Sequence, residues 1–117
     1  MSALVEAAWT VLDGVAAGAP ASLRKGPRGG GRGRDKILQH VLNAEAAYAR
    51  KIGIRHPEPA LDDANAVQAL RSAIATALGS ASDGSPPAAK GWPARYAARR
   101  IAWHVLDHAW EIEDRSS

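Results

Sequence analysis

Apolar residues recur every three or four positions in four separate stretches of the chain, which is the spacing of one face of an α-helix. The pattern predicts helices over about residues 3–17, 35–52, 62–79 and 93–113. The side chains expected to point inward are Leu4, Ala8, Val11 and Val15 in the first, Ile37, Val41, Ala44 and Tyr48 in the second, Val67, Leu70, Ile74 and Leu78 in the third, and Ala97, Ile101, Val105 and Ile112 in the fourth.

Residues that start or stop helices stand at the ends of these stretches. Gly18 and Gly53 follow the first and second, and glycine is common just beyond a helix C-terminus. Asp62 or Asp63 is a suitable N-cap for the third helix, and Pro93 suits the first turn of the fourth. Four amphipathic helices of similar length predict an all-α protein folded as a four-helix bundle.

Composition agrees with a single helical domain over residues 1–117. The chain is rich in alanine and contains no phenylalanine, so closely packed helices are favoured over a sheet. Long polar connections over about 19–34 and 80–91 are expected to be flexible. The absence of cysteine excludes a disulfide framework, a thiolate zinc site and a cysteine nucleophile.

The N-terminal stretch and the longest apolar runs bear on location. Residues 1–15 lack the basic segment that begins a signal peptide. No apolar run approaches the roughly 20 residues that a membrane span requires. The expected location is the cytoplasm.

The net charge of +3 is concentrated in one glycine-rich stretch. Its cations are Arg24, Lys25, Arg28, Arg32, Arg34 and Lys36. Such a patch raises the alternative of nucleic-acid binding, but the stretch has no interleaved aromatic residues and no helix-turn-helix pattern. Its glycines match neither a phosphate-binding loop nor a dinucleotide motif. A solvated loop is the favoured interpretation.

Three of the four histidines are placed to meet. His104 and His108 are four residues apart on the fourth helix, so their imidazoles project from the same face. His40 flanks the apolar stripe of the second helix. Three imidazoles from two helices would form a facial nitrogen site for a divalent metal.

Acidic residues near these histidines are candidates for supporting roles. Asp107, Glu111 and Glu45 are possible acceptors for the second ring nitrogen of a ligand histidine. Glu111 is also a candidate fourth ligand or general base. The alternative without a metal is that buried histidines simply hydrogen-bond to Asp107 or Glu111.

An aromatic stripe runs along the other side of the fourth helix. Tyr96, Trp103 and Trp110 are spaced seven residues apart. Each tryptophan can bury up to roughly 250 Å², so a cover is expected. The stripe predicts a homodimer, or coverage by a loop or terminus.

The histidine arrangement resembles the DinB/YfiT-like superfamily of metal-dependent four-helix bundles. The resemblance rests on His40 within residues 37–45, and on His104 and His108 within residues 102–108. It implies a divalent ion, zinc or nickel, held by these three histidines with coordination positions open to water or substrate. Several members of that superfamily are thiol-dependent transferases or isomerases, and dimers are frequent among them.

Two kinds of chemistry follow if the resemblance holds. A metal-bound water would be acidified toward a pKa of about 7, or an external low-molecular-weight thiol would bind as thiolate. Glu111 or Asp107 would then orient a ligand or accept a proton, and the glycine-rich loop or Arg95, Arg99 and Arg100 would attract an anionic substrate. The alternative of another class is a non-catalytic dimeric bundle that binds a metal or small ligand without turnover.

Overall fold

The structure, a computed structural model, describes residues 2–19, 33–80 and 91–115. They form four α-helices: α1 (Ser2–Gly18), α2 (Arg34–Arg50), α3 (Ala64–Ser80) and α4 (Ala94–Arg115). No strand occurs among these residues, which confirms the predicted all-α four-helix bundle. Most of the glycine-rich stretch and most of the second polar connection lie outside the described residues. The prediction that both are flexible therefore concerns residues that the structure does not describe.

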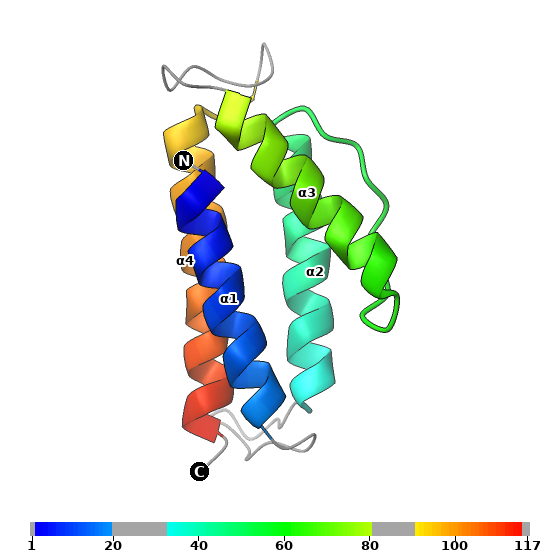
Figure 1. Cartoon of the computed structure of the whole chain (residues 1–117), viewed down its shortest axis with the longest axis vertical. Helices are drawn as coiled ribbons and strands as arrows, with labels where there is room; N and C mark the ends of the chain where they lie inside the picture. Colours follow the sequence, from blue (N-terminus) through cyan, green and yellow to red (C-terminus); the bar gives the residue numbers. More distant parts are fainter. Residues whose placement is uncertain (1, 20–32, 81–90, 116–117) are drawn as a thin grey trace.

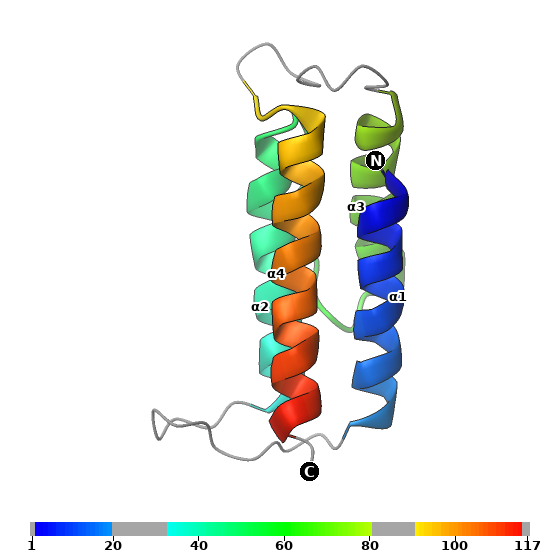
Figure 2. The same cartoon turned by 90° about the vertical axis from the view of Figure 1, so that its left-hand side faces the viewer.

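The four helices run in two parallel pairs (Figure 1). α1 and α4 run in one direction, whereas α2 and α3 run in the other. Residues 51–63 therefore pass along the length of the bundle between α2 and α3. Figure 2 shows α2 beside α4 and α1 beside α3. The neighbouring pair α2 and α4 is antiparallel, which brings the middle of one helix beside the middle of the other.

Local sequence sets the helix boundaries. The Asp63 carboxylate accepts a hydrogen bond from the backbone N–H of Ala66 at 3.1 Å, which is the N-cap geometry expected for this residue. The carbonyl of Pro93 accepts the N–H of Ala97 at 2.9 Å. After α2, Gly53 adopts a φ of 85°, a left-handed conformation that favours glycine. The predicted helix ends are thus confirmed to within a few residues.

The core confirms the predicted stripes of α3 and α4 more closely than those of α1 and α2. Ala97, Ile101, Val105 and Ile112 are all fully buried in α4, and Leu70, Ile74 and Leu78 are buried in α3. In α2, Ile37 and Val41 are buried, whereas Ala44 and Tyr48 are half-buried. Val67 is also only half-buried.

The predicted stripe of α1 was partly wrong. Leu4 is 48 % exposed and Val11 is 43 % exposed, whereas Val5 and Trp9 are buried. A shift of one residue rotates a helix face by 100°. The large indole of Trp9 decides the rotation, because it both buries a wide apolar surface and carries a donor that needs a buried partner.

That partner is Glu45, the one fully buried charged residue in the described part of the chain. The Trp9 indole donates a hydrogen bond from Nε1 to Oε1 of Glu45 at 2.8 Å, while Oε2 has no hydrogen-bond partner. Burial raises the pKa of the Glu45 carboxyl from 4.5 to about 7, against the lowering effects of the Trp9 hydrogen bond and the Arg71 charge.

Two further polar contacts join the helices. Arg71 of α3 donates two hydrogen bonds to the Asp13 carboxylate of α1, at 2.8 and 3.1 Å, and its guanidinium lies 5.3 Å from the Trp9 ring centroid. The Gln39 side chain donates to the Pro59 carbonyl and accepts the Leu61 N–H, both at 2.8 Å. The second contact fastens the long α2–α3 connection to α2.

The buried carboxyl predicts a pH-dependent stability. Because the folded-state pKa of Glu45 is raised, its contribution is fully present below about pH 4.5 and is lost as the pH rises through 7. A shift of this size corresponds to roughly 3 kcal/mol. Glu45→Gln has no carboxyl to ionise, so it should not lose this stability as the pH rises. Between pH 5 and pH 8, the free energy of unfolding of the variant should therefore rise relative to that of the wild type by about 3 kcal/mol.

Urea unfolding of both proteins at several pH values measures this difference. Taking the difference removes the titration of groups common to both proteins, including the histidines. A difference that stays constant with pH would show that Glu45 is not a desolvated carboxyl.

Candidate metal centre

The structure brings His40, His104 and His108 together. The ring centroid of His40 lies 5.4 Å from that of His104 and 4.9 Å from that of His108. The ring centroids of His104 and His108 are 4.6 Å apart. One nitrogen from each imidazole lies within 4.8 Å of the other two. The cause is the i, i+4 spacing on α4 combined with the antiparallel packing of α2 beside it (Figure 2).

The cluster lies at the edge of the bundle, at the seam between α2 and α4. His104 and His108 are half-buried, and His40 is exposed. His40 thus lies beside the buried stripe of α2, which contains Ile37 and Val41, and faces α4. A site at a seam has protein on one side and solvent on the other, so an ion held there would keep coordination positions open.

Glu111 supports His108. The Glu111 carboxylate lies 2.9 Å from Nδ1 of His108, and both side chains are largely shielded from solvent. Since a carboxylate accepts, Nδ1 carries the proton, and Nε2 is the nitrogen left to bind an ion. This carboxylate–histidine pair is the arrangement commonly found behind a metal ligand. The expected role of Glu111 as an outer acceptor matches its position.

The other two predicted acidic residues lie elsewhere. Asp107 is exposed, and its charge acts on His104 through space, where it opposes the lowering of the pKa. Glu45 was expected as a possible partner of a ligand histidine, but it bonds to Trp9 in the core instead. Glu45 is five positions after His40, which places the two side chains about 140° apart around α2.

His104 is held in the neutral form. Burial, and to a smaller extent the neighbouring His108 and His40, together lower its pKa from 6.5 to about 4. Its Nδ1 is buried and has no hydrogen-bond partner among the described residues. A buried nitrogen that lacks a partner is costly, and a neutral imidazole is the form that binds a metal. His104 therefore has both the protonation state and the unsatisfied atom expected of a ligand.

The three residues fit a divalent ion by chemistry and by distance. Imidazole nitrogens bind zinc at about 2.0–2.1 Å, so two ligand nitrogens in a tetrahedral site lie roughly 3.4 Å apart. Small side-chain rotations would close the present separations of up to 4.8 Å. The His40, His104 and His108 group could thus hold a metal ion.

The predicted basic patch is only partly within the described residues. Arg34 and Lys36 begin α2, whereas Arg24, Lys25, Arg28 and Arg32 lie outside. Arg34 bonds to the Asp35 carboxylate at 3.0 Å and to the Ala19 carbonyl at 3.0 Å. Arg34 thus joins the start of α2 to the end of α1, a structural role that charge patterning did not reveal.

Sequence reasoning missed two features. The buried pairing of Trp9 with Glu45 has no local signature, because the two residues are 36 positions apart. The second is a hollow that His56 lines together with Arg50 and Arg55. The only available signal for that hollow was the cluster of cations on either side of Gly53.

Comparisons with known proteins found no relative. No family model, no curated protein and no solved structure matches the chain. The resemblance to the DinB/YfiT-like superfamily stays a prediction that rests on the three histidines and the four-helix fold. Within the described residues, no helix combines the length and apolar character needed to cross a membrane.

The contact between Glu111 and His108 predicts a specific loss of metal affinity. Glu111→Gln removes the charge that orients the His108 ring and raises its basicity, so affinity should fall about 10- to 100-fold. Competition with a chromophoric chelator measures the dissociation constant. Glu113→Gln is the matched control, because Glu113 is exposed on the same helix and its loss should leave affinity unchanged. Equal affinities for both variants would contradict a role of Glu111 behind His108.

Proposed function

We propose that this protein binds one divalent transition-metal ion through His40, His104 and His108. The observation that carries the proposal is the convergence of three imidazole nitrogens from two helices within 4.8 Å. Three cationic imidazoles could not share such a space without repulsion, and the low pKa of His104, about 4, keeps that ring neutral. Neutral imidazoles that converge are more readily explained by an ion than by packing, because Nδ1 of His104 has no partner in the part of the chain that the structure describes.

Zinc and nickel are the proposed ions. The donor set is all nitrogen, and the chain has no cysteine. Imidazole suits zinc, nickel and copper, whereas magnesium and calcium require oxygen ligands. Glu111 is already committed to His108, so it serves the ligand rather than the ion.

The further proposal is metal-dependent catalysis with an external thiol or with water, in a transferase, isomerase or hydrolase. The ion would supply Lewis acidity to a coordinated water or thiol. The chain contributes a neutral His104, a Glu111 that orients His108, and an exposed His40 at the opening. Asp107 directly precedes His108 in the sequence and is exposed, so its carboxylate could exchange a proton with solvent.

We also propose that two copies of the chain pair through the aromatic face of α4, defined as Tyr96, Trp103 and Trp110. These side chains are 48, 61 and 50 % exposed, and the rings of Trp103 and Trp110 contact each other edge-on at 6.0 Å. Monomers rarely expose such a continuous aromatic surface.

The charges beside this aromatic face favour a second copy as the partner. Arg99 and Arg100 border its N-terminal half, and Asp107 and Asp114 border its C-terminal half. If two copies of α4 pair antiparallel about Trp103, Tyr96 lies opposite Trp110 of the second copy and Arg99 lies opposite its Asp107. A patch that is complementary to itself in this way is what a two-fold interface requires.

Metal binding is tested directly on the purified protein. After incubation with zinc or nickel and gel filtration, about one ion per chain should remain by elemental analysis. At a free metal concentration 100 times the dissociation constant, the folded state gains about 2.7 kcal/mol, which should raise the melting temperature. His40→Ala, His104→Ala and His108→Ala should each lose the ion. The matched control His56→Ala should retain it, because His56 is outside the cluster. Wild-type protein that retains no ion and melts at the same temperature would refute the metal centre.

Self-association is tested by light scattering coupled to gel filtration. The wild type should elute with twice the mass of one chain, and Trp103→Glu should elute with the mass of one. Val11→Glu is the control, because it introduces the same charge at another exposed apolar residue. A monomeric wild type at high protein concentration would overturn the proposed interface.

A further inference from the structure

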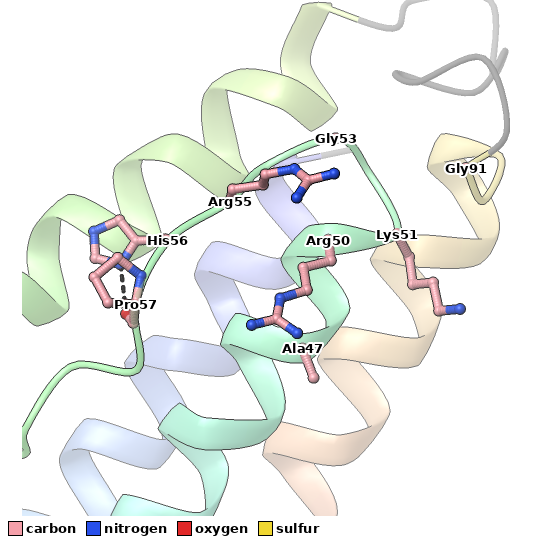
Figure 3. Close-up of a pocket in the computed structure, with 8 residues that line it drawn as sticks. All are labelled: Ala47, Arg50, Lys51, Gly53, Arg55, His56, Pro57 and Gly91. Carbon is pink, nitrogen blue, oxygen red and sulfur yellow. Dashed lines mark hydrogen bonds between the residues drawn. The ribbon is translucent and has the colours of Figure 1, made fainter.

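A hollow of about 1010 Å³ lies where α2 ends and the connection to α3 begins. Its polar lining comes from Arg50, Lys51, Arg55 and His56. Both arginines line the hollow, and Figure 3 shows the Arg50 guanidinium beside Ala47 on the helix and the Arg55 guanidinium on the connection, turned toward Gly53. The Lys51 amine points away toward the Gly91 side, where it lies 6.0 Å from the centroid of the Trp92 ring.

Among the described residues, no acidic side chain balances the positive charge in this hollow. No aspartate or glutamate lines it, and within the described residues neither Arg50 nor Arg55 forms an ion pair or side-chain hydrogen bond. Two guanidinium groups that share one space repel each other, and an anion between them would relieve this. Arginine donors match the oxygens of phosphate and carboxylate groups in paired geometry.

His56 adds a further polar atom to the hollow. Its Nδ1 lies 2.7 Å from the Pro57 carbonyl oxygen, which can only accept. Nδ1 therefore carries the proton, and Nε2 is left to interact with a ligand.

The hollow lies on the same side of α2 as the histidine cluster. Ala47, which lines the hollow, is seven residues from His40, so the two share one helix face about 10 Å apart. The ring of Tyr48, the residue after Ala47, lies 5.5 Å from that of His104. The Arg100 guanidinium lies 5.9 Å from the Tyr48 ring centroid. Cationic and aromatic groups thus continue from the imidazoles toward the hollow.

We propose that the hollow is a binding site for the acidic group of the small molecule that also reaches the ion. The ligand class is an anionic small molecule whose phosphate or carboxylate contacts Arg50 and Arg55. Its metal-binding atom would lie on the order of 10–15 Å from that acidic group. Anion binding by the hollow stands without the ion, whereas the link to the ion rests on the proposed metal centre.

The first experiment uses metal-free protein, with inorganic pyrophosphate and succinate as separate probes. Titration followed by amide NMR should shift resonances of residues 47–57 and the Nε–H signals of Arg50 and Arg55. A response to pyrophosphate alone identifies a phosphate site, and a response to succinate alone identifies a carboxylate site. Shifts confined to other parts of the chain, or none with either probe, would overturn the proposal.

Single charge removals test the assignment of the two arginines. Arg50→Gln and Arg55→Gln should each weaken binding of the responding probe about 10-fold, the effect of one charge-assisted hydrogen bond. Lys36→Gln is the matched control, because it removes one exposed cation from the other end of α2. Equal weakening in all three variants would show attraction by overall charge and contradict a site.

The link to the ion is tested with protein loaded with cobalt(II), a paramagnetic probe. Phosphorus-31 relaxation of bound pyrophosphate, or proton relaxation of bound succinate, should report a distance to the ion on the order of 10–15 Å. Loss of the ion in His104→Ala should abolish the enhancement without changing the affinity for the probe. Protein that binds the probe but not cobalt would refute the metal centre alone. Binding of both with no relaxation enhancement would refute the shared ligand.

Discussion

The rotation of α4 about its own axis is the constraint on which the other features depend. Ala97, Ile101, Val105 and Ile112 are fully buried, and burying each large aliphatic side chain contributes about 1.5–3 kcal/mol. Because successive residues are 100° apart around a helix, turning that face inward fixes the direction of every other side chain of α4. His104 and His108 are carried to the seam with α2, and Trp103 and Trp110 are carried to the surface. Packing of apolar residues therefore positions residues that do not themselves belong to the core.

α2 divides its surface between two polar systems. On one side Glu45 bonds to Trp9 of α1 in the core, near the Arg71–Asp13 pair that joins α3 to α1. On another side His40 meets the two histidines of α4. The two systems differ in their solvation. The Glu45 carboxyl is fully buried and its pKa is raised, so it acts on stability, whereas the histidines lie at an accessible seam where an ion and a ligand could enter.

The histidine cluster and the hollow lined by Arg50 and Arg55 both bring basic side chains together, but they differ in how repulsion between positive charges is relieved. Among the histidines, burial and mutual proximity lower the pKa of His104, so neutrality removes the repulsion. Arginine has no such option because it stays protonated at any pH that a protein tolerates. Arg50 and Arg55 line one hollow without a carboxylate in its lining, and the proposed anion would offset their charges. Neutral imidazoles can accept a metal cation, whereas guanidinium groups that stay charged favour an anion.

Local spacing was enough to predict four helices, their approximate ends, the buried stripe of α4 and the pairing of His104 with His108. These features depend on the helical repeat and on caps such as Asp63, both of which act within a few residues. The exposure of Tyr96, Trp103 and Trp110 also followed from that repeat, because the opposite face was already apolar. The prediction that His40 joins the cluster depended additionally on a bundle in which α2 and α4 are neighbours.

Only the tertiary structure decided the rotation of α1, the partner of Glu45, the exposure of His40 and the hollow beside Gly53. In α1, the stripe through Leu4 and Val11 and the one through Val5 and Trp9 have the same period. The stripe through Val5 and Trp9 is the buried one, and it brings Trp9 to its hydrogen bond with Glu45, 36 residues away. The path of residues 51–63 along the bundle likewise placed Arg55 in the lining of the same hollow as Arg50. Periodicity is a property of neighbouring residues, whereas burial and charge pairing depend on segments that only the fold brings together.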